Sequence, residues 1–285
     1  MIPAAFDYVR AKSLRDALNA LALKDGSKLI AGGHSLIPLM RFRLAAPTKL
    51  VDVGGLEELK GIEEKGRGAR IGAATTYREL LDSPLIKERF PVMYDAVSGI
   101  ADLQVRNRGT VGGGIAHADP ASDMPAVMLA LGATMSLRSK AGKRSVAAAE
   151  FFTGPFVTAM ADDEMLIDII VPPLPRGAGS AYVSFEQQAS GYALAAVAAV
   201  IGKSRKTVNH ASVAITGVSE SGAYLMASAA LLIGTNADSA ALDAASAGAT
   251  EGITVNSDIH APADYRAHLA RVAARRAIAL ASSRA

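Results

Sequence analysis

The sequence contains no cysteine and no tryptophan, and aromatic residues make up only 5% of it. Without cysteine, this chain cannot itself form disulfides, zinc–thiolate sites or cysteine-ligated iron–sulfur clusters. A lack of disulfides fits the cytoplasm. Few aromatics leave few stacking platforms for single-stranded nucleic acid. The basic residues are scattered and the net charge is only +3, so we expect no nucleic-acid binding.

Long hydrophobic runs are also missing, although half of the residues are hydrophobic. The most apolar stretch, 192–201, is about 10 residues long, whereas a helix that spans a bilayer needs about 20. The N-terminal sequence MIPAAFDYVRAKS has no basic region followed by an apolar run, and so does not resemble a secretory signal. We therefore expect a soluble cytoplasmic protein without stable membrane insertion.

A chain of 285 residues is long enough for about two domains. The segment 172–179, PPLPRGAG, is the best candidate for a linker. We predict a first domain over 1–175, with subdomains of about 1–55 and 56–175, and a second over 178–285. The overall class is α+β, because strands precede helices in the second part.

Local patterns predict the individual elements of both domains. Ser13 with Asp16, and Thr76 with Glu79, are spaced to cap the starts of helices. The expected helices are 13–23, 35–43, one from 76, 91–101, 123–131, 224–233, 239–250 and 262–282. The expected strands are 28–31, 50–53, 69–73, 133–137, 165–171 and, as a three-stranded antiparallel sheet in the second domain, 180–185, 193–201 and 207–217.

Two glycine-rich motifs stand out. The first, Ala31-Gly32-Gly33-His34-Ser35, lies between a predicted strand and a predicted helix. Glycines there allow close backbone approach and positive φ, and the free amides at a helix start form an anion site. Ser35 either caps the helix or donates to a phosphate. Read alone, the motif is better explained as an ordinary strand–turn–helix junction.

The second motif is a glycine-rich turn predicted over 109–114, and it contains Gly112-Gly113-Gly114. Three consecutive glycines are costly in conformational entropy, and a close approach of the backbone to a ligand would explain them. Asp119 and Asp123 follow, and their carboxylates can accept hydrogen bonds from sugar hydroxyls. The alternative is that Asp123 only caps the next helix.

Other nucleotide and catalytic signatures are missing. No G-x-G-x-x-G supports a Rossmann site, and Gly202-Lys203-Ser204 lacks the upstream glycine of a P-loop, since Val197 stands there. The five histidines are dispersed without metal-ligand spacing. We expect no metal site and no catalytic residue that acts on a substrate directly.

Taken together, the motifs resemble the FAD-binding medium subunits of molybdenum hydroxylases of the aerobic carbon monoxide dehydrogenase type. The resemblance extends over essentially the whole chain. The segments that carry it are AGGHSLIPLMRFR (31–43), QVRNRGTVGGGIAHADPASDMPA (104–126), MLIDIIVP (165–172), TVNHASVAITGVSE (207–220) and DIHAPADYRAHLARVAARRAI (258–278).

The resemblance implies a two-subdomain FAD-binding fold of the vanillyl-alcohol-oxidase (PCMH) type, followed by a C-terminal domain of the CO dehydrogenase flavoprotein type. It implies that 31–35 and 110–114 embrace the FAD diphosphate, that Asp123 binds the ribityl or ribose, and that Tyr192 lies beside the flavin. The full set of implied cofactor-binding residues is Ala31, Gly32, Gly33, His34, Ser35, Leu36, Ile100, Thr110, Val111, Gly112, Gly113, Gly114, Ala118, Asp119, Asp123, Leu166, Glu186 and Tyr192.

The implied activity is electron relay. A large partner subunit with molybdopterin oxidises the substrate, a small partner with [2Fe-2S] clusters carries single electrons, and this chain's FAD passes them to quinone, NAD⁺ or oxygen. A dimer of heterotrimers is expected. One alternative is a self-sufficient flavin oxidase with FAD linked to His34, and another is a scaffolding protein without cofactor. The sequence leaves the substrate and the electron acceptor open.

Three positions depart from the family pattern. Gly114 stands where the family often has Asn or Ser, which removes one side-chain donor but keeps the backbone. Gly191 stands where the family's Gly-Asp-Tyr motif has its acidic residue, and Glu186 stands near a position where the family often has Lys or Arg. A cation there would stabilise the anionic reduced flavin. We therefore expect its absence to lower the flavin potential, and Glu186→Lys to raise it.

Overall fold

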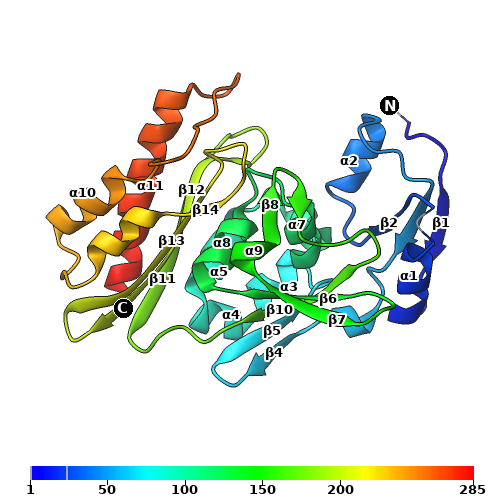
Figure 1. The fold of residues 1–285 in the computed structure, drawn as a ribbon, viewed down its shortest axis with the longest axis horizontal. Helices are drawn as coiled ribbons and strands as arrows, with labels where there is room; N and C mark the ends of the chain where they lie inside the picture. The colour runs from blue at the N-terminus through cyan, green and yellow to red at the C-terminus, as the bar shows by residue number, and fades with distance from the viewer. Residues whose placement is uncertain (1, 24) are drawn as a thin grey trace.

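The computed structural model describes residues 2–23 and 25–285. Three larger sheets, each with its helices, follow one another along the long axis of the molecule (Figure 1). The N-terminal unit lies at one end and the C-terminal helix lies toward the other, so the chain crosses the molecule once. Among the described helices, none is long and apolar enough to cross a membrane.

The N-terminal unit is a three-stranded parallel sheet in the order β1-β3-β2. Its helix α1 buries Leu14, Leu18 and Leu21 at helical spacing, and the Ser13 hydroxyl accepts a hydrogen bond from the Asp16 amide, as the sequence predicts. The elements of this unit are β1 (Asp7–Arg10), α1 (Leu14–Leu21), β2 (Ser27–Ile30), α2 (Leu36–Arg41) and β3 (Lys49–Asp52).

The middle unit is a five-stranded antiparallel sheet in the order β4-β5-β10-β6-β7, packed against helices. Every residue of α8 is buried, because this helix lies in the centre of the main hydrophobic core. The strands are β4 (Ile62–Lys65), β5 (Gly68–Gly72), β6 (Thr134–Arg138), β7 (Lys143–Ala147) and β10 (Met165–Val171).

Short helices and one small hairpin complete this unit. The predicted capping box is present, since Thr76 and Glu79 each bond the other's backbone amide at the start of α3. These elements are the 3₁₀ helix Glu57–Leu59, α3 (Tyr77–Asp82), α4 (Pro84–Arg89), α5 (Pro91–Gly99), α6 (Leu103–Arg108), α7 (Val111–His117), α8 (Asp123–Leu131), α9 (Ala148–Phe151), β8 (Phe152–Gly154) and β9 (Val157–Thr158).

The C-terminal unit is an antiparallel sheet in the order β11-β12-β13-β14, with helices on one face. It has four strands where the sequence predicts three, because Tyr224–Leu225 pairs with β13. The helix predicted over 224–233 is therefore wrong at its start, and a 3₁₀ helix, Ala227–Leu232, follows instead. The remaining elements are β11 (Ala178–Glu186), β12 (Ala193–Ser204), β13 (Thr207–Thr216), β14 (Tyr224–Leu225), α10 (Ser239–Ala247) and α11 (Ala263–Ser283).

The alanine-rich strand β12 lies between two helical layers. Its alternate residues Ala196, Ala198 and Val200 join the core of the middle unit, and the residues between them join the core beneath α11. Small side chains on both faces let the helices approach closely. The strand predicted over 193–201 is confirmed, and both of its faces are covered within this chain.

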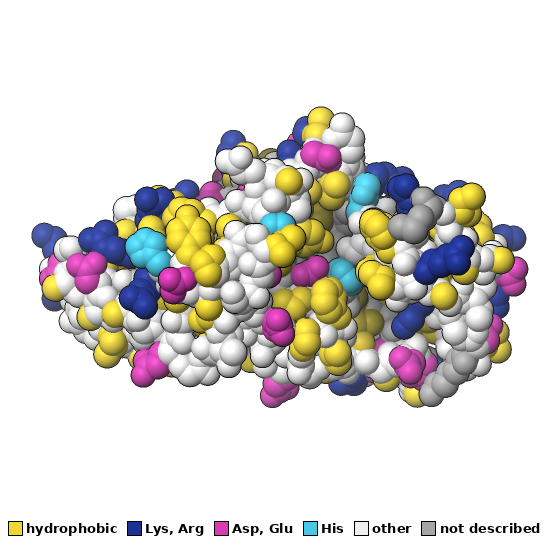
Figure 2. Space-filling view, turned by 90° about the horizontal axis from the view of Figure 1, so that it is seen from above, with side chains coloured by type: hydrophobic (Ala, Val, Ile, Leu, Met, Phe, Trp, Pro, Cys, Tyr) yellow, Lys and Arg dark blue, Asp and Glu magenta, His cyan; other side chains and the backbone are white. Residues whose placement is uncertain are grey.

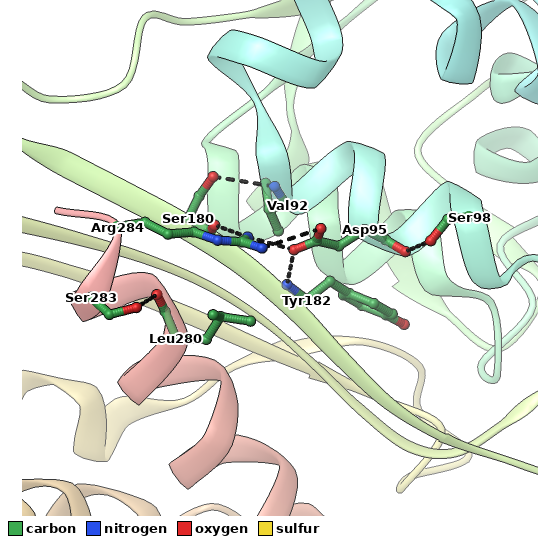
Figure 3. A network of polar contacts seen from close by, with 8 residues as sticks. All are labelled: Val92, Asp95, Ser98, Ser180, Tyr182, Leu280, Ser283 and Arg284. Carbon is green, nitrogen blue, oxygen red and sulfur yellow. Dashed lines mark hydrogen bonds and ion pairs between the residues drawn. The ribbon is translucent and has the colours of Figure 1, made fainter.

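A polar network joins the end of the chain to the middle unit (Figure 3). The Arg284 guanidinium donates to the Asp95 carboxylate at 2.6 Å and to the Ser180 carbonyl at 2.7 Å. The Ser180 hydroxyl accepts from the Val92 amide at 3.2 Å. The network thus connects α5, β11 and the residue after α11.

Candidate functional site

The two glycine motifs, distant in sequence, lie side by side. A Cβ added to Gly32 would stand 2.2 Å from the carbonyl oxygen of Arg108 and 2.9 Å from the Cα of Gly109. No side chain fits in that space, so glycine is required where the first motif packs on the segment leading into the second. This contact joins the N-terminal unit to the middle unit.

A cavity of about 880 Å³ opens where the two units meet. Figure 2 shows the surface hollowed between them. Its volume lies at the upper end of the range for ligand sites. The predicted site residues that line it are Ala31, Gly32, Gly33, His34, Ser35, Leu36, Ile100, Thr110, Gly112, Gly113, Gly114, Asp119, Asp123, Leu166 and Tyr192.

Three predicted site residues do not line the cavity. Val111 is fully buried in the main core, and Ala118 is also buried. Glu186 is exposed at the end of β11. We therefore do not place these three side chains against a ligand, although the first two belong to segments that do line the cavity.

The first motif has free backbone amides. The amides of residues 32–36 have no hydrogen-bond acceptor among the described residues, and Gly33 has a φ of 78°. The Ser35 hydroxyl does not cap α2, so the capping alternative for this residue is not seen. A turn of unpaired amides that faces a cavity suits an anionic group such as a diphosphate.

The second motif differs from the expectation of a turn with free amides. Residues 111–117 form helix α7, and the amides of 111–114 are already bonded to the Thr75 and Ala73 carbonyls and to the hydroxyl and carbonyl of Thr110. Packing explains the glycines, because a Cβ on Gly112 would lie 2.5 Å from the Cβ of Ala73, and one on Gly114 would lie 2.2 Å from the Tyr77 hydroxyl. Glycine here lets a helix form part of the cavity wall.

Asp123 is the most strongly perturbed acid of the cavity. It opens α8 and is 9% exposed, and its Oδ1 accepts from the Tyr182 hydroxyl at 2.5 Å. Burial raises the pKa of Asp123 to about 7, and the negative charges of Glu186 and Asp119 add to this rise. The carboxyl therefore holds a proton over part of the physiological range. It does not cap α8 with its side chain; the residue at the cap position is Ser122.

His117 and Asp119 follow α7 at the cavity wall. Desolvation lowers the pKa of His117, which favours the neutral imidazole. The Asp119 carboxylate lies 4.0 Å from its Nε2 and accepts from the Ala121 amide at 2.9 Å. The same side of the cavity thus carries one acceptor carboxylate and one uncharged ring.

One wall was missed by the sequence analysis. Phe156 and Val157, in and beside the β8–β9 hairpin, line the cavity, and the Phe156 ring lies 5.2 Å from that of His117. Phe156 has a φ of 58°, which is strained for a bulky residue. The Gly154-Pro155 pair marks a turn here, but nothing local indicates that the turn reaches a cavity.

Comparison with known proteins places this geometry. Residues 4–174 match the family described as the FAD binding domain in molybdopterin dehydrogenase, and residues 180–281 match the CO dehydrogenase flavoprotein C-terminal domain. This chain belongs to the FAD-binding medium chains of molybdenum hydroxylases. The predicted family, fold class and FAD cofactor are thereby confirmed.

Its relatives among these medium chains align over almost their whole length. The carbon monoxide dehydrogenase medium chain of Afipia carboxidovorans is 40% identical over 286 residues, covering 100% of this chain and 99% of that one. The glyceraldehyde dehydrogenase medium chain of Sulfolobus acidocaldarius is 39% identical, covering 93% and 92%. A structure of reconstituted CO dehydrogenase from Oligotropha carboxidovorans superposes with a TM-score of 0.96 at 40% identity, covering 100% of both chains.

Proposed function

We propose that FAD lies in the cavity with its diphosphate at the free amides of residues 32–36. The observation that carries this assignment is the turn of unpaired amides beside a large cavity. The apolar side chains of Ile100 and Leu166, together with Tyr192, would line the isoalloxazine. Asp123 and Asp119 would receive sugar hydroxyls, with Asp123 able to donate as well while it is protonated.

The chain's own residues would bind, orient and shield the cofactor. Flavin supplies exchange of one or two electrons. Glycine contacts fix the distance between the N-terminal and middle units, and the Phe156 hairpin covers one side of the cavity. Oδ1 of Asp123 accepts from the Tyr182 hydroxyl beside the site, so a proton on this carboxyl would be held at Oδ2. In none of these roles does a residue carry out acid–base chemistry on a reducing substrate, and this fits a relay subunit.

The partners follow from the relatives' designation as medium chains and from composition. A chain without cysteine cannot ligate [2Fe-2S] clusters with its own thiolates. We assign the clusters to a small partner subunit and molybdopterin to a large one, in a cytoplasmic dimer of heterotrimers. Electrons would pass from the clusters through FAD to an external acceptor. The relatives are medium chains of dehydrogenases that act on different substrates, carbon monoxide and glyceraldehyde. We therefore propose that the partner subunit, and not this chain, determines the substrate.

Two finer assignments also remain proposals. The proposed domains, 1–175 and 178–285, divide the chain within the loop between β10 and β11. We also propose that the flavin potential is lowered, because Glu186 stands in place of a cation, and its charge would act at a distance from an exposed position.

Affinity purification of the tagged full chain from its native host tests the proposal. We expect yellow protein with FAD released on denaturation, accompanied by two further subunits, molybdenum and iron. Colour that stays with the denatured chain, with no companion subunits, would instead indicate the oxidase with FAD linked to His34. Colourless protein that takes up no FAD would indicate a scaffold.

A matched pair of glycine variants tests the place of the diphosphate. Gly32→Ala should abolish FAD uptake, because its Cβ would collide with backbone at 2.2 Å. Gly154→Ala should leave uptake intact, since its Cβ would meet only the Val157 side chain, at 3.9 Å. Equal FAD affinity in both variants, measured by quenching of flavin fluorescence, would remove the first motif from the site.

A further inference from the structure

The loop between α5 and α6 forms part of the cavity wall through Ile100 and Ala101. Ala101 has a φ of 43°, a left-handed conformation that is uncommon and strained for a residue other than glycine. Such strain persists only when surrounding contacts hold the backbone in place. The question is therefore which side chain holds this loop.

Arg106 makes those contacts. Its Nη1 donates to the Ile100 carbonyl at 2.7 Å and to the Ala101 carbonyl at 2.9 Å. Helix α6, which carries Arg106, has no buried residue of its own, so the helix gains little from packing. A single guanidinium nitrogen that bonds both carbonyls fixes the orientation of the two peptide groups on either side of Ala101.

The same loop supports a second part of the wall. A Cβ on Gly191 would lie 3.3 Å from the Cα of Ala101, so the 190–192 segment packs directly on it. Ser190, Gly191 and Tyr192 all line the cavity. A shift of the Ala101 backbone would therefore move Ile100 and would release Tyr192.

The guanidinium also places a positive charge behind this wall. Arg106 forms no ion pair with a carboxylate of the described residues, and its Nε is buried without a partner. Arg106 is half-buried, and a charge that is not neutralised locally and is partly shielded from water acts on neighbouring groups more strongly than a fully solvated one. An anionic ligand on the other side of the loop would be stabilised.

We infer that Arg106 is a positioning residue for the flavin: it clamps the Ile100–Ala101 loop that forms the ring wall and holds a compensating positive charge behind it. This inference rests on the proposed function. In this inference, Arg106 on α6 supplies the cation near the ring, because Glu186 on β11 cannot supply one.

The test compares Arg106→Gln, Arg106→Lys and the control Arg78→Gln in the FAD-loaded complex. Arg78 lies exposed on the neighbouring helix α3, and among residues 2–23 and 25–285 its one ion-pair partner is Asp82. The measurements are the midpoint potential of the flavin and the FAD dissociation constant from flavin fluorescence. Arg106→Gln should shift the potential to more negative values and weaken FAD binding about tenfold, which is the scale of a lost charge-assisted hydrogen bond.

Arg106→Lys separates charge from geometry. Lysine keeps the charge, but its flexible stem and freely rotating ammonium do not hold the two carbonyls in one fixed geometry, so we expect the potential to stay close to that of the unmodified protein while FAD binding weakens several-fold. An unchanged potential and affinity in Arg106→Gln would overturn the inference. So would a loss of thermal stability in both variants with no change of potential. If the glutamine variant fails to fold, unchanged FAD affinity in the lysine variant overturns the clamp.

The failure of the proposed function has a different signature. In that case the unmodified protein itself takes up no FAD, and no comparison among variants is needed. Unmodified protein that binds FAD, with an Arg106→Gln variant that matches it and Arg78→Gln in every measurement, leaves the function standing and removes only the role of Arg106.

Discussion

Asp123 shows how one side chain connects cavity chemistry to stability. It is a carboxyl group in the main core, and its only side-chain hydrogen bond among the described residues comes from Tyr182, in a different unit. Glycine spacing identified its motif from sequence, but its burial could not be predicted, because α8 becomes central only when the C-terminal sheet covers it. The sequence-based alternative of a capping role depended on local geometry alone.

Asp123→Asn should flatten the pH dependence of stability. Burial raises the pKa of Asp123 in the folded protein to about 7 from its ordinary value of 3.8, so between these values the folded protein holds a proton that the unfolded chain has released. Stability of the unmodified chain therefore falls as pH rises through this window, by about 1 kcal/mol per pH unit. Asparagine keeps an acceptor for Tyr182 and removes the titration.

Thermal unfolding of the FAD-free chains from pH 4 to 8 measures this difference. The unmodified chain should lose stability relative to Asp123→Asn across the window, and the two curves should run parallel above it. Parallel curves throughout would mean that Asp123 ionises normally in the folded protein.

At the scale of elements, the second glycine motif lines the cavity but forms helix α7 and not the predicted turn. Glycine is a poor helix former, so the run Gly112–Gly114 predicts a turn. Tertiary contacts override that preference, because the helix packs so closely on Ala73 and Tyr77 that larger residues do not fit. For the Phe156 hairpin, the sequence indicates the turn through Gly154-Pro155, but nothing local indicates that this turn lies at the cavity.

A helix with three glycines should depend on its cap. The Thr110 hydroxyl accepts from the Gly113 amide at 3.1 Å, so we expect Thr110→Ala to lower the free energy of unfolding by about 1 kcal/mol. Thr110→Ser keeps the hydroxyl and should lose much less. Urea denaturation measures both, and equal losses would assign the effect to the buried methyl group and not to the cap.

At the scale of the whole molecule, the fold class and the family followed from the order of two motifs and a linker. The contacts between units did not, because they join residues far apart in the chain. Arg284, the penultimate residue, reaches Asp95 and Ser180 across the boundary between the C-terminal and middle units (Figure 3). No periodicity or motif identifies such a pair in a single sequence.

Arg284→Ala should destabilise the protein more than an exposed arginine does. Its side chain and that of Asp95 are 34% and 22% exposed, and Asp95 also accepts from the Tyr182 amide. We expect a loss of roughly 1–3 kcal/mol. The control Arg275→Ala breaks a pair whose side chains are 45% and 59% exposed and should cost below about 1 kcal/mol. Equal denaturation midpoints for the two variants would mean that the network of Figure 3 contributes no more to stability than an exposed ion pair.

The Thr216 hydroxyl, at the end of β13, lies within 2.9 Å of both the Pro120 and the Ser122 carbonyls, and the Gly217 amide donates to Pro120 as well. The loop between Asp119 and Asp123 is thus held in shape from the C-terminal unit. Exchange of the C-terminal segment between relatives would therefore also change the contacts that hold this loop. In a chimera, a different C-terminal segment would support the floor of the cavity in which we propose that FAD lies. The absorption spectrum of the flavin would then differ from that of the unmodified protein.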